Sequence, residues 1–303
     1  MDGLVAQIGI ALIVVGPMVV SVFLGGFLLQ RRKAIARARR KSPIGFDLLR
    51  PPGHGLGEQI EQLQEDLWEQ LFRLMFVPTA VVALYFGQIA LLGDKNVGLG
   101  VALIYGALTV ANAAYCLRQL LKIATELDKL KAGYDAELAV GQELNQLMHQ
   151  GALVFHDFPA EQFNIDHVVV ARQGVFAVET KGYTKLAEGD GRKNATVVFD
   201  GKKLVFPNYS TTKPLEQSAR QAKWLTEWLS SATGTRVRAA PVLALPGWFV
   251  DPGGEGTVIV LSGRMLKTLL EKNAHQSLTD QTIQQIAHQL GQRCRDVTPL
   301  YSR

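Results

Sequence analysis

Residues that build sulfur-based sites are scarce in this sequence. Its 303 residues include only two cysteines, Cys116 and Cys294. Two isolated cysteines form neither a zinc-ligand spacing nor a disulfide framework. The sequence also has no Gly-rich phosphate-binding loop and no Ser-His-Asp order of the kind found in many hydrolases. These absences direct the search for a site to carboxylate, ammonium and amide side chains.

Charged residues are also few. They make up 19% of the chain, against about 25% in a typical soluble domain. This deficit indicates that part of the chain lies in lipid. Residues 1–132 contain 14 Lys and Arg against 10 Asp and Glu, whereas residues 133–303 contain 18 against 17. The C-terminal half is almost neutral, so its overall charge does not by itself indicate a nucleic-acid partner.

Long runs without charge predict three transmembrane helices. Residues 4–29 contain no charged side chain over 26 positions, and residues 74–92 and 97–117 form two further apolar runs. A helix needs about 20 apolar residues to cross a bilayer. A signal peptide is the alternative interpretation of the first run, but this run is too long for one, and acidic rather than basic residues precede it, in the sequence Met-Asp-Gly. We therefore expect an uncleaved anchor there.

Basic residues after the first run set the expected orientation. Residues 31–41 contain seven Arg or Lys, and such clusters stay on the cytoplasmic side of a membrane. We expect a multi-pass protein of the cell membrane with its N-terminus outside and its C-terminal half in the cytoplasm. Residues 58–74 carry leucines on one helical face and acids on the other, which predicts a cytoplasmic amphipathic helix leading into the second span.

The C-terminal half alternates strands with helices. Gly133 is expected to break the helix that follows the third span, and residues 135–150 to form a new helix. Strands are expected at 152–159, within 163–182, in a hairpin turning at Asp200-Gly201, and in "VRAAPVLAL" and "GTVIVLS". A helix is expected from Lys213, with Pro214 at its start, and two more at about 263–272 and 278–292. This pattern predicts an α/β fold.

The apolar hairpin 163–182 carries three ionisable residues, Asp166, Glu179 and Lys181. Side chains alternate along a strand, so Glu179 and Lys181 share a face, and Asp166 on the partner strand can lie beside them. A buried charge needs a partner or a metal. One interpretation is a structural ion pair of Lys181 with either carboxylate. The other is a divalent cation, Mg²⁺, held by Asp166 and Glu179.

The order of a helix glutamate, "NIDHVVV" and "GVFAVETKG" resembles the nuclease-related domain, NERD, a branch of the PD-(D/E)xK restriction-endonuclease-like superfamily. The resemblance runs from about Gly133 to Leu245. The family has a Gly-Glu pair in the leading helix, where this chain has Ala136 and Glu137, with Glu143 as the neighbouring alternative. A Pro-x-x-Gln element is supplied by "KPLEQ" as Pro214 and Gln217, and Gln221 lies one turn further on the same face.

The resemblance implies roles for these residues. Asp166, Glu179 and Glu137 would hold Mg²⁺ or Mn²⁺. Lys181 would orient or deprotonate the attacking water or stabilise the phosphate, and Gln217 would position the lysine or a phosphate. The implied fold is a restriction-endonuclease-like core, a mixed central sheet flanked by helices, following an all-α membrane region.

The resemblance and the apolar runs together give the expected organisation of the chain: residues 1–30, transmembrane helix 1; 31–73, a cytoplasmic basic and amphipathic linker; 74–117, a transmembrane hairpin; 118–132, a helical linker; 133–250, the nuclease-like domain; 251–303, a strand and helices completing it. The expected function is a membrane-anchored, metal-dependent endonuclease that hydrolyses DNA or RNA at the cytoplasmic face. The alternative is a non-catalytic module that binds nucleic acid or a protein partner at the membrane.

Other conspicuous side chains have simpler interpretations. His167 points to the opposite face from Asp166, which is typical of a packed core histidine. Trp224 and Trp228 are spaced four residues apart on one helix and are expected in the core rather than in a base-stacking platform. Residues 181–203 contain six Lys and Arg against three acids, which fits a solvated hairpin or a groove for DNA.

Overall fold

The computed structural model describes residues 43–92, 98–185 and 191–299, together with a few residues near the N-terminus: Leu24, Phe27, Leu28, Arg31, Arg32 and Ile35. Almost all of the expected first span, 4–29, and most of the basic run 31–41 therefore lie outside the described residues. The chain separates into two compact units. One contains residues 61–127, and the other contains residues 44–60 and 128–301.

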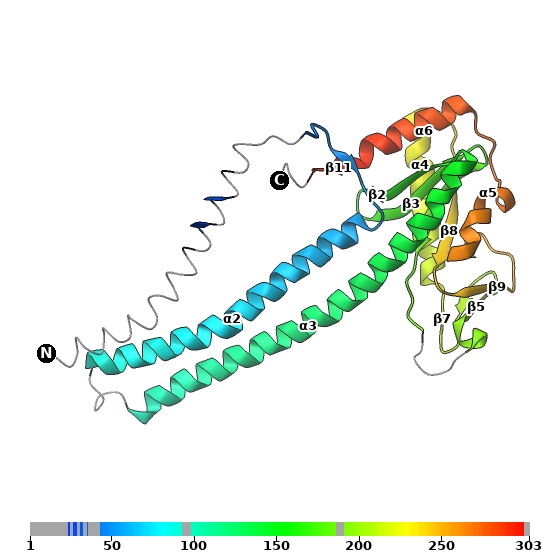
Figure 1. Ribbon diagram of the computed structural model, residues 1–303. Helices are drawn as coiled ribbons and strands as arrows, with labels where there is room; N and C mark the ends of the chain where they lie inside the picture. The colour runs from blue at the N-terminus through cyan, green and yellow to red at the C-terminus, as the bar shows by residue number, and fades with distance from the viewer. Residues whose placement is uncertain are drawn as a thin grey trace. The chain divides into compact units, whose positions relative to one another are not determined.

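The first unit contains most of two long helices, α2 (His54–Leu92) and α3 (Leu99–Asn145). Residues 61–92 and 99–127 lie side by side (Figure 1), and the rings of Tyr85 and Tyr105 meet edge to face at 5.9 Å. Two helices in the described part of the chain are long and apolar enough to cross a membrane, at His54–Ile89 and Leu99–Gln150. These helices include most residues of the expected second and third spans, 74–92 and 97–117.

The expected helix break at Gly133 is wrong, because α3 continues from Leu99 to Asn145. A glycine inside a helix costs only about 1 kcal/mol relative to alanine, and neighbouring turns easily offset that cost. The glycine also gives room for packing: a Cβ at this position would lie 3.3 Å from Cδ1 of Leu56, at the start of α2. Similarly, α2 begins before the expected amphipathic segment 58–74 and runs through it without interruption.

The second unit is built on a five-stranded mixed sheet with the order β10-β8-β4-β3-β2. The strands β2, β3 and β4 are antiparallel neighbours, whereas β4, β8 and β10 are parallel. Their bounds are β2 Leu153–Pro159, β3 Asn164–Ala171, β4 Gly174–Thr180, β8 Ala239–Leu245 and β10 Ile259–Ser262. The expected strands of the hairpin 163–182 and of the central sheet are confirmed, and with them the mixed α/β class.

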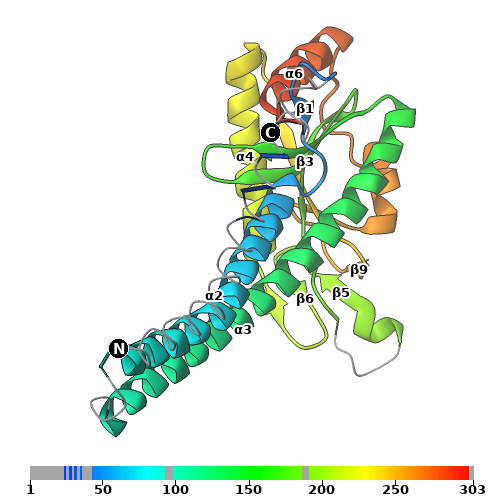
Figure 2. The same ribbon diagram turned by 60° about the vertical axis from the view of Figure 1, so that its left-hand side comes forward.

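Helices cover both faces of this sheet because its strands are apolar on both sides. Val168 and Val175 pack with the helices α4 (Lys213–Thr233) and α6 (Asp280–Arg293). On the other face, Val169 and Phe176 pack with the C-terminal part of α3, and with η2 (Gln146–Gln150), η4 (Gly263–Thr268) and α5 (Leu269–Lys272). Figure 2 shows α4 on one side of the sheet and α3 with α5 on the other. The central strand β4 is therefore buried along its whole length.

A second, four-stranded sheet has the order β7-β6-β5-β9. Its strands are β5 Thr196–Phe199, β6 Leu204–Val205, β7 Ser210–Thr211 and β9 Phe249–Pro252, and the short helix η3, Arg192–Ala195, precedes β5. The expected hairpin at Asp200-Gly201 is confirmed, with Phe199 opposite Leu204. The strand β9 was not predicted, nor was the pair formed by β1 (Leu48–Leu49) and β11 (Arg295–Val297).

Candidate active site

Strand geometry brings Asp166 and Glu179 together. His167 on β3 is directly opposite Val178 on β4, so the residues just beyond them, Asp166 and Glu179, are neighbours at the end of the pair. Both follow the alternation of the face that α4 covers, where Val168 and Ala177 are buried. The expected juxtaposition of these two carboxylates is what the register produces.

Glu179 is enclosed by two polar partners. Its carboxylate is 2% exposed and lies 2.6 Å, through Oε1, from Nζ of Lys181. Nε2 of Gln221 on α4 donates to the other oxygen, Oε2, at 2.6 Å. Burial would lower the pKa of Lys181, but the charge of Glu179 and the hydrogen bond between them raise it overall. The lysine side chain is 31% exposed, so its ammonium lies at the boundary with solvent.

Asp166 and Glu137 add two more carboxylates to this group. Burial raises the pKa of Asp166 well above its usual range, and the charges of Glu179 and Glu137 raise it further, against a hydrogen bond that Thr180 N–H donates to Oδ2 at 2.6 Å. Burial and the charges of Asp157 and Glu179 raise the pKa of Glu137 to about 7. The site therefore holds more negative charge than its one lysine compensates.

Helix α3 places Glu137 near Asp166 and Glu179 because the helix runs close to the segment that follows β4. A Cβ added to Gly182 would lie 2.7 Å from Cβ of Ala136 and 2.8 Å from the carbonyl oxygen of Ala132. Only a glycine at position 182 allows this approach. The alternative helix residue, Glu143, instead accepts a long hydrogen bond of 3.5 Å from Gln146 in an exposed part of the helix.

A cleft of about 510 Å³ opens beside these carboxylates. Glu137 and Asp166 line it, together with residues from the start of α2, from the adjoining ends of β2 and β3 and from the connection between these strands: Gly55, Leu56, Gln59, Asp157, Ala160, Glu161, Gln162, Phe163 and Asn164. Glu137 and Asp166 are thus open to a molecule that enters the cleft, whereas Glu179 is not among the lining residues.

The glutamine that contacts the site is Gln221 rather than Gln217. Gln221 is 3% exposed and binds Glu179, while its Nε2 also donates to the carbonyl oxygen of Asn164 at 3.3 Å. Its Oε1 is buried and has no hydrogen-bond partner among the described residues. Gln217 is half-buried one turn earlier, and within the described ranges it makes no hydrogen bond to these side chains. The Pro-x-x-Gln pattern alone did not indicate this difference.

A second acidic group, centred on Asp157, was not predicted. Asp157 is 4% exposed and has a positive φ of 47°, a strained conformation for a residue other than glycine. Its carboxylate accepts hydrogen bonds from Arg50 at 3.2 Å, from the backbone N–H of Gly55 at 3.0 Å and from Asn164 at 3.0 Å. Arg50 also binds Asp296 at 2.6 Å. This network fixes the start of α2 at the wall of the cleft.

The histidines and tryptophans have structural surroundings, as expected. Nδ1 of His167 lies 2.9 Å from Nδ1 of His156, whose Nε2 is 3.0 Å from Asn145. Burial lowers the pKa of His156 to about 4 and that of His167 well below its usual range, the second with help from the charge of His156. Trp224 and Trp228 stack on each other and pack against the core beneath α4.

The donor set at the site matches the preference of hard divalent cations for oxygen ligands. Its geometry is not that of a closed metal shell: within the described ranges, no three His, Cys, Asp or Glu side chains lie close enough together to form a metal-binding group. Glu179 is turned toward Lys181 and Gln221. A cation bound here would compete with Lys181 and Gln221 for the oxygens of Glu179.

Comparisons with known proteins bear on the domain that contains this site. Searches against curated proteins and against solved structures gave no significant match. Residues 132–246 match the family model of NERD, the nuclease-related domain, and that range contains Glu137, Asp166, Glu179, Lys181 and Gln221.

Proposed function

We propose that this protein is a metal-dependent nuclease that hydrolyses phosphodiester bonds of DNA or RNA, with a restriction-endonuclease-like core. The observation that carries the proposal is the position of Glu137 and Asp166 near the ion pair of Glu179 and Lys181, beside an open cleft. Burial, and after it repulsion among these carboxylates, raises the pKa of Asp166 and Glu137. Such perturbed groups in a cleft are typical of functional sites, and the match to the nuclease-related domain supports the same chemistry.

In this proposal Asp166, Glu179 and Glu137 hold Mg²⁺ or Mn²⁺. When bound, a divalent ion neutralises phosphate charge and lowers the pKa of a coordinated water. The residues fit a divalent cation because three carboxylates have one lysine near them to offset their charge. In addition, the amide oxygen of Gln221 has no hydrogen-bond partner among the described residues. Placing a cation relieves the repulsion that raises the pKa of Asp166.

The chain's own residues have distinct roles in this reaction. Lys181, at the boundary with solvent, contacts a phosphate oxygen and stabilises the negative charge that develops there. The backbone N–H of Lys181 donates to the carbonyl oxygen of Ala244 at 3.0 Å, which holds the lysine against β8. Gln221 keeps Glu179 in position through its hydrogen bond. Gly182 lets Glu137 approach the other two carboxylates.

We also propose that the helical hairpin anchors the domain to the cell membrane. Along α2 and α3, large apolar side chains such as Met75, Leu84, Leu99 and Leu103 are more than 60% exposed. Isolated exposed apolar residues are common, but a row of them along two helices of spanning length is best covered by lipid. The basic residues at 31–41 then place the N-terminus outside and the nuclease domain in the cytoplasm.

The test is to measure Mg²⁺ and Mn²⁺ binding and plasmid nicking by the full-length protein in detergent. Glu179→Ala and Lys181→Ala should abolish cleavage, and Glu179→Ala should also weaken metal binding. Glu143→Ala is the matched control, because Glu143 is on the same helix as Glu137 but accepts its hydrogen bond away from the site. Cleavage that survives in Glu179→Ala would refute the assigned site.

One observation favours the alternative of a non-catalytic module. Glu179 is bound on both oxygens, by Lys181 and by Gln221, as a structural ion pair would be. If the pair is purely structural, Glu179→Ala should destabilise the domain by leaving Lys181 without its partner. If the carboxylates form a metal site, the same change relieves repulsion and leaves the melting temperature unchanged or higher. Melting curves with and without Mg²⁺ therefore separate the two functions.

A further inference from the structure

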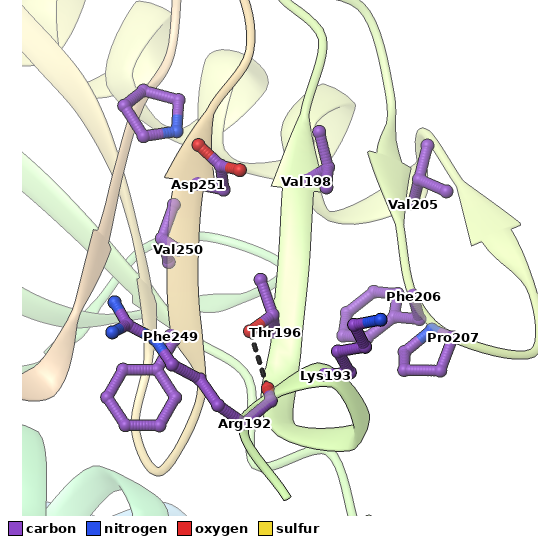
Figure 3. Close-up of a pocket in the computed structure, with 11 residues that line it drawn as sticks. Arg192, Lys193, Thr196, Val198, Val205, Phe206, Pro207, Phe249, Val250 and Asp251 are labelled. Atoms are coloured by element: carbon purple, nitrogen blue, oxygen red, sulfur yellow. Dashed lines mark hydrogen bonds between the residues drawn. The ribbon is translucent and has the colours of Figure 1, made fainter.

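A second pocket lies on the open face of the small sheet, away from the carboxylates. It has a volume of about 790 Å³. Strand alternation explains its lining: Val197 and Phe199 of β5 point into the core, so Thr196 and Val198 face outward, beside Val205 of β6 and Phe249 of β9. Figure 3 shows these side chains side by side across the strands. The sheet thus presents a flat, apolar floor to solvent.

Cations stand at the edge of this floor. Arg192 and Lys193 of η3 line the pocket, and the guanidinium carbon of Arg192 lies 5.0 Å from the centroid of the Phe249 ring. Phe249 itself remains 46% exposed. Asp251 is the acid among the lining residues. An exposed ring with cations at its edge suits a flat ligand that carries negative charge.

Aromatic rings connect the candidate active site to this pocket. Tyr183 lies two residues after Lys181, and its ring meets that of Phe206 at 5.0 Å. Phe206 lines the pocket and stacks on Tyr209 at 4.7 Å with an angle of 9°. Tyr209 is 42% exposed. Lys185 adds a cation at 5.9 Å from the ring of Trp248, which itself contacts Phe206 at 4.9 Å.

We propose that this aromatic and basic surface binds a single-stranded polynucleotide and leads it to the candidate active site. We call it the strand-binding surface; it comprises Lys185, Arg192, Lys193, Tyr209 and Phe249, while Phe206, 3% exposed, supports Tyr209 from beneath. The inference rests on the proposed function and specifies its substrate class. Bases of a single strand are free to stack on exposed rings while lysine and arginine contact the phosphates, whereas a duplex keeps its bases stacked on each other.

The experiment measures binding of fluorescent oligothymidylate, oligouridylate and a duplex to the full-length protein in detergent, by anisotropy with EDTA present. Excluding divalent ions separates binding from cleavage. Phe249→Ala and Arg192→Glu should each weaken single-strand binding about fivefold or more, the lower range for losing one base–aromatic stack. Phe249→Tyr should retain affinity, because the ring is kept.

Two matched controls lie at the other end of the central sheet. Met148, 48% exposed, and Arg236, also exposed, precede the strands β2 and β8 at their starts. Leu153, Val170, Val175 and Ala239 form one row across that end, whereas Glu179 is opposite Leu243 at the far end. Met148→Ala and Arg236→Glu should leave binding within about twofold, as expected for solvent-exposed positions with no ligand contact.

The outcomes separate this inference from the proposed function. Loss of single-strand binding in Phe249→Ala and Arg192→Glu, with the controls unaffected, supports the strand-binding surface even if no cleavage occurs. A different result is that the wild-type protein cleaves nucleic acid while Phe249→Ala and Arg192→Glu bind and cleave it equally well. That result would refute the strand-binding surface and would leave the proposed nuclease function standing. Equal affinity for the duplex, or no binding of any nucleic acid, would also overturn it; the latter would point to a protein ligand for the pocket.

Discussion

Two aspartates from neighbouring strands, the buried Asp157 and the half-buried Asp166, have opposite electrostatic surroundings. Asp157 accepts hydrogen bonds from an arginine, a backbone N–H and an amide, so three donors offset its charge. Asp166 accepts one backbone hydrogen bond and otherwise faces Glu179 and Glu137. Complete pairing is typical of a carboxylate that fixes a fold. Crowding of like charges is typical of a site that recruits something from outside the chain.

The largest expected effect comes from Asp166→Asn. The amide oxygen can still accept the hydrogen bond from Thr180 N–H, so the backbone should be retained. Nuclease activity should fall by about a hundredfold to a thousandfold, as when one group that stabilises transition-state charge is removed. The melting temperature should stay unchanged or rise, because a source of repulsion is gone. Plasmid nicking and calorimetry on the same preparation measure both quantities.

A lower melting temperature for Asp166→Asn would break the comparison. It would mean that Asp166 is a structural acid like Asp157, held by contacts that the asparagine cannot make. Glu143→Gln serves as the control, since it removes one carboxylate of α3 whose hydrogen bond lies outside the site.

The second largest effect is expected from Asp157→Ala, as a loss in the free energy of unfolding. Asp157→Ala removes the acceptor of three hydrogen bonds, one of them from the side chain of Arg50, which is 15% exposed. Arg50 keeps Asp296 as a partner, so the loss should be about 2–3 kcal/mol, the range for hydrogen bonds to charged groups. Urea unfolding of the full-length protein in detergent measures the change.

Asp296→Asn is the matched control for this prediction. It removes the other acid bound to Arg50, but that acid is 44% exposed, and exposed ion pairs contribute about 1 kcal/mol or less. If Asp296→Asn destabilises the protein as much as Asp157→Ala, the buried position of Asp157 is not what matters.

The difference between these aspartates also marks how far the sequence could be interpreted. Asp166 and Glu179 were predicted to converge because alternation and a short turn fix both positions within 14 residues of chain. The network of Asp157 depends on Arg50 and Asp296, which are distant in sequence, so no local pattern signals it. The strand β9 was missed for the same reason, because its partner β5 lies about 50 residues earlier.

The predicted helix break at Gly133 failed because tertiary packing, rather than the local sequence, decides whether a glycine ends a helix. Gly133 was expected to end a helix, yet its lack of a side chain serves the contact with Leu56. Within α4 the Pro-x-x-Gln pattern indicates Gln217, whose role stays a prediction, and the phase of the helix relative to β4 brings Gln221 into contact with Glu179. Both glutamines occupy the same general face, so only the tertiary structure distinguishes them.

A buried histidine on the other face of the sheet predicts that the stability of the protein depends on pH. His156 is buried, and burial lowers its pKa to about 4 from an unfolded value of 6.5. As the pH falls below 6.5 the unfolded chain takes up a proton that the folded protein refuses, so stability is lost down to about pH 4. The loss should be about 3 kcal/mol by pH 4, since the two pKa values differ by about 2.5 and one pKa unit corresponds to about 1.4 kcal/mol.

His156→Gln tests this prediction, because glutamine does not titrate and can still donate toward Asn145. Denaturant unfolding between pH 7 and pH 4.5 should show a shallower decline for the variant than for the wild type. Parallel curves would show that the fall in stability comes from other groups.

The smallest expected effect compares the two glutamines of α4. Gln221→Ala removes the hydrogen bond of 2.6 Å to Glu179 and leaves a buried carboxylate oxygen without a donor. Nuclease activity should fall about tenfold, within the range that loss of a residue orienting a metal ligand produces. Gln217→Ala, one turn earlier and without such a bond, should change activity less than twofold. If Gln217→Ala is the more damaging change, then this glutamine contacts substrate, and the resting structure understates its role. If neither substitution changes nuclease activity, then the ion pair with Lys181 is sufficient to orient Glu179.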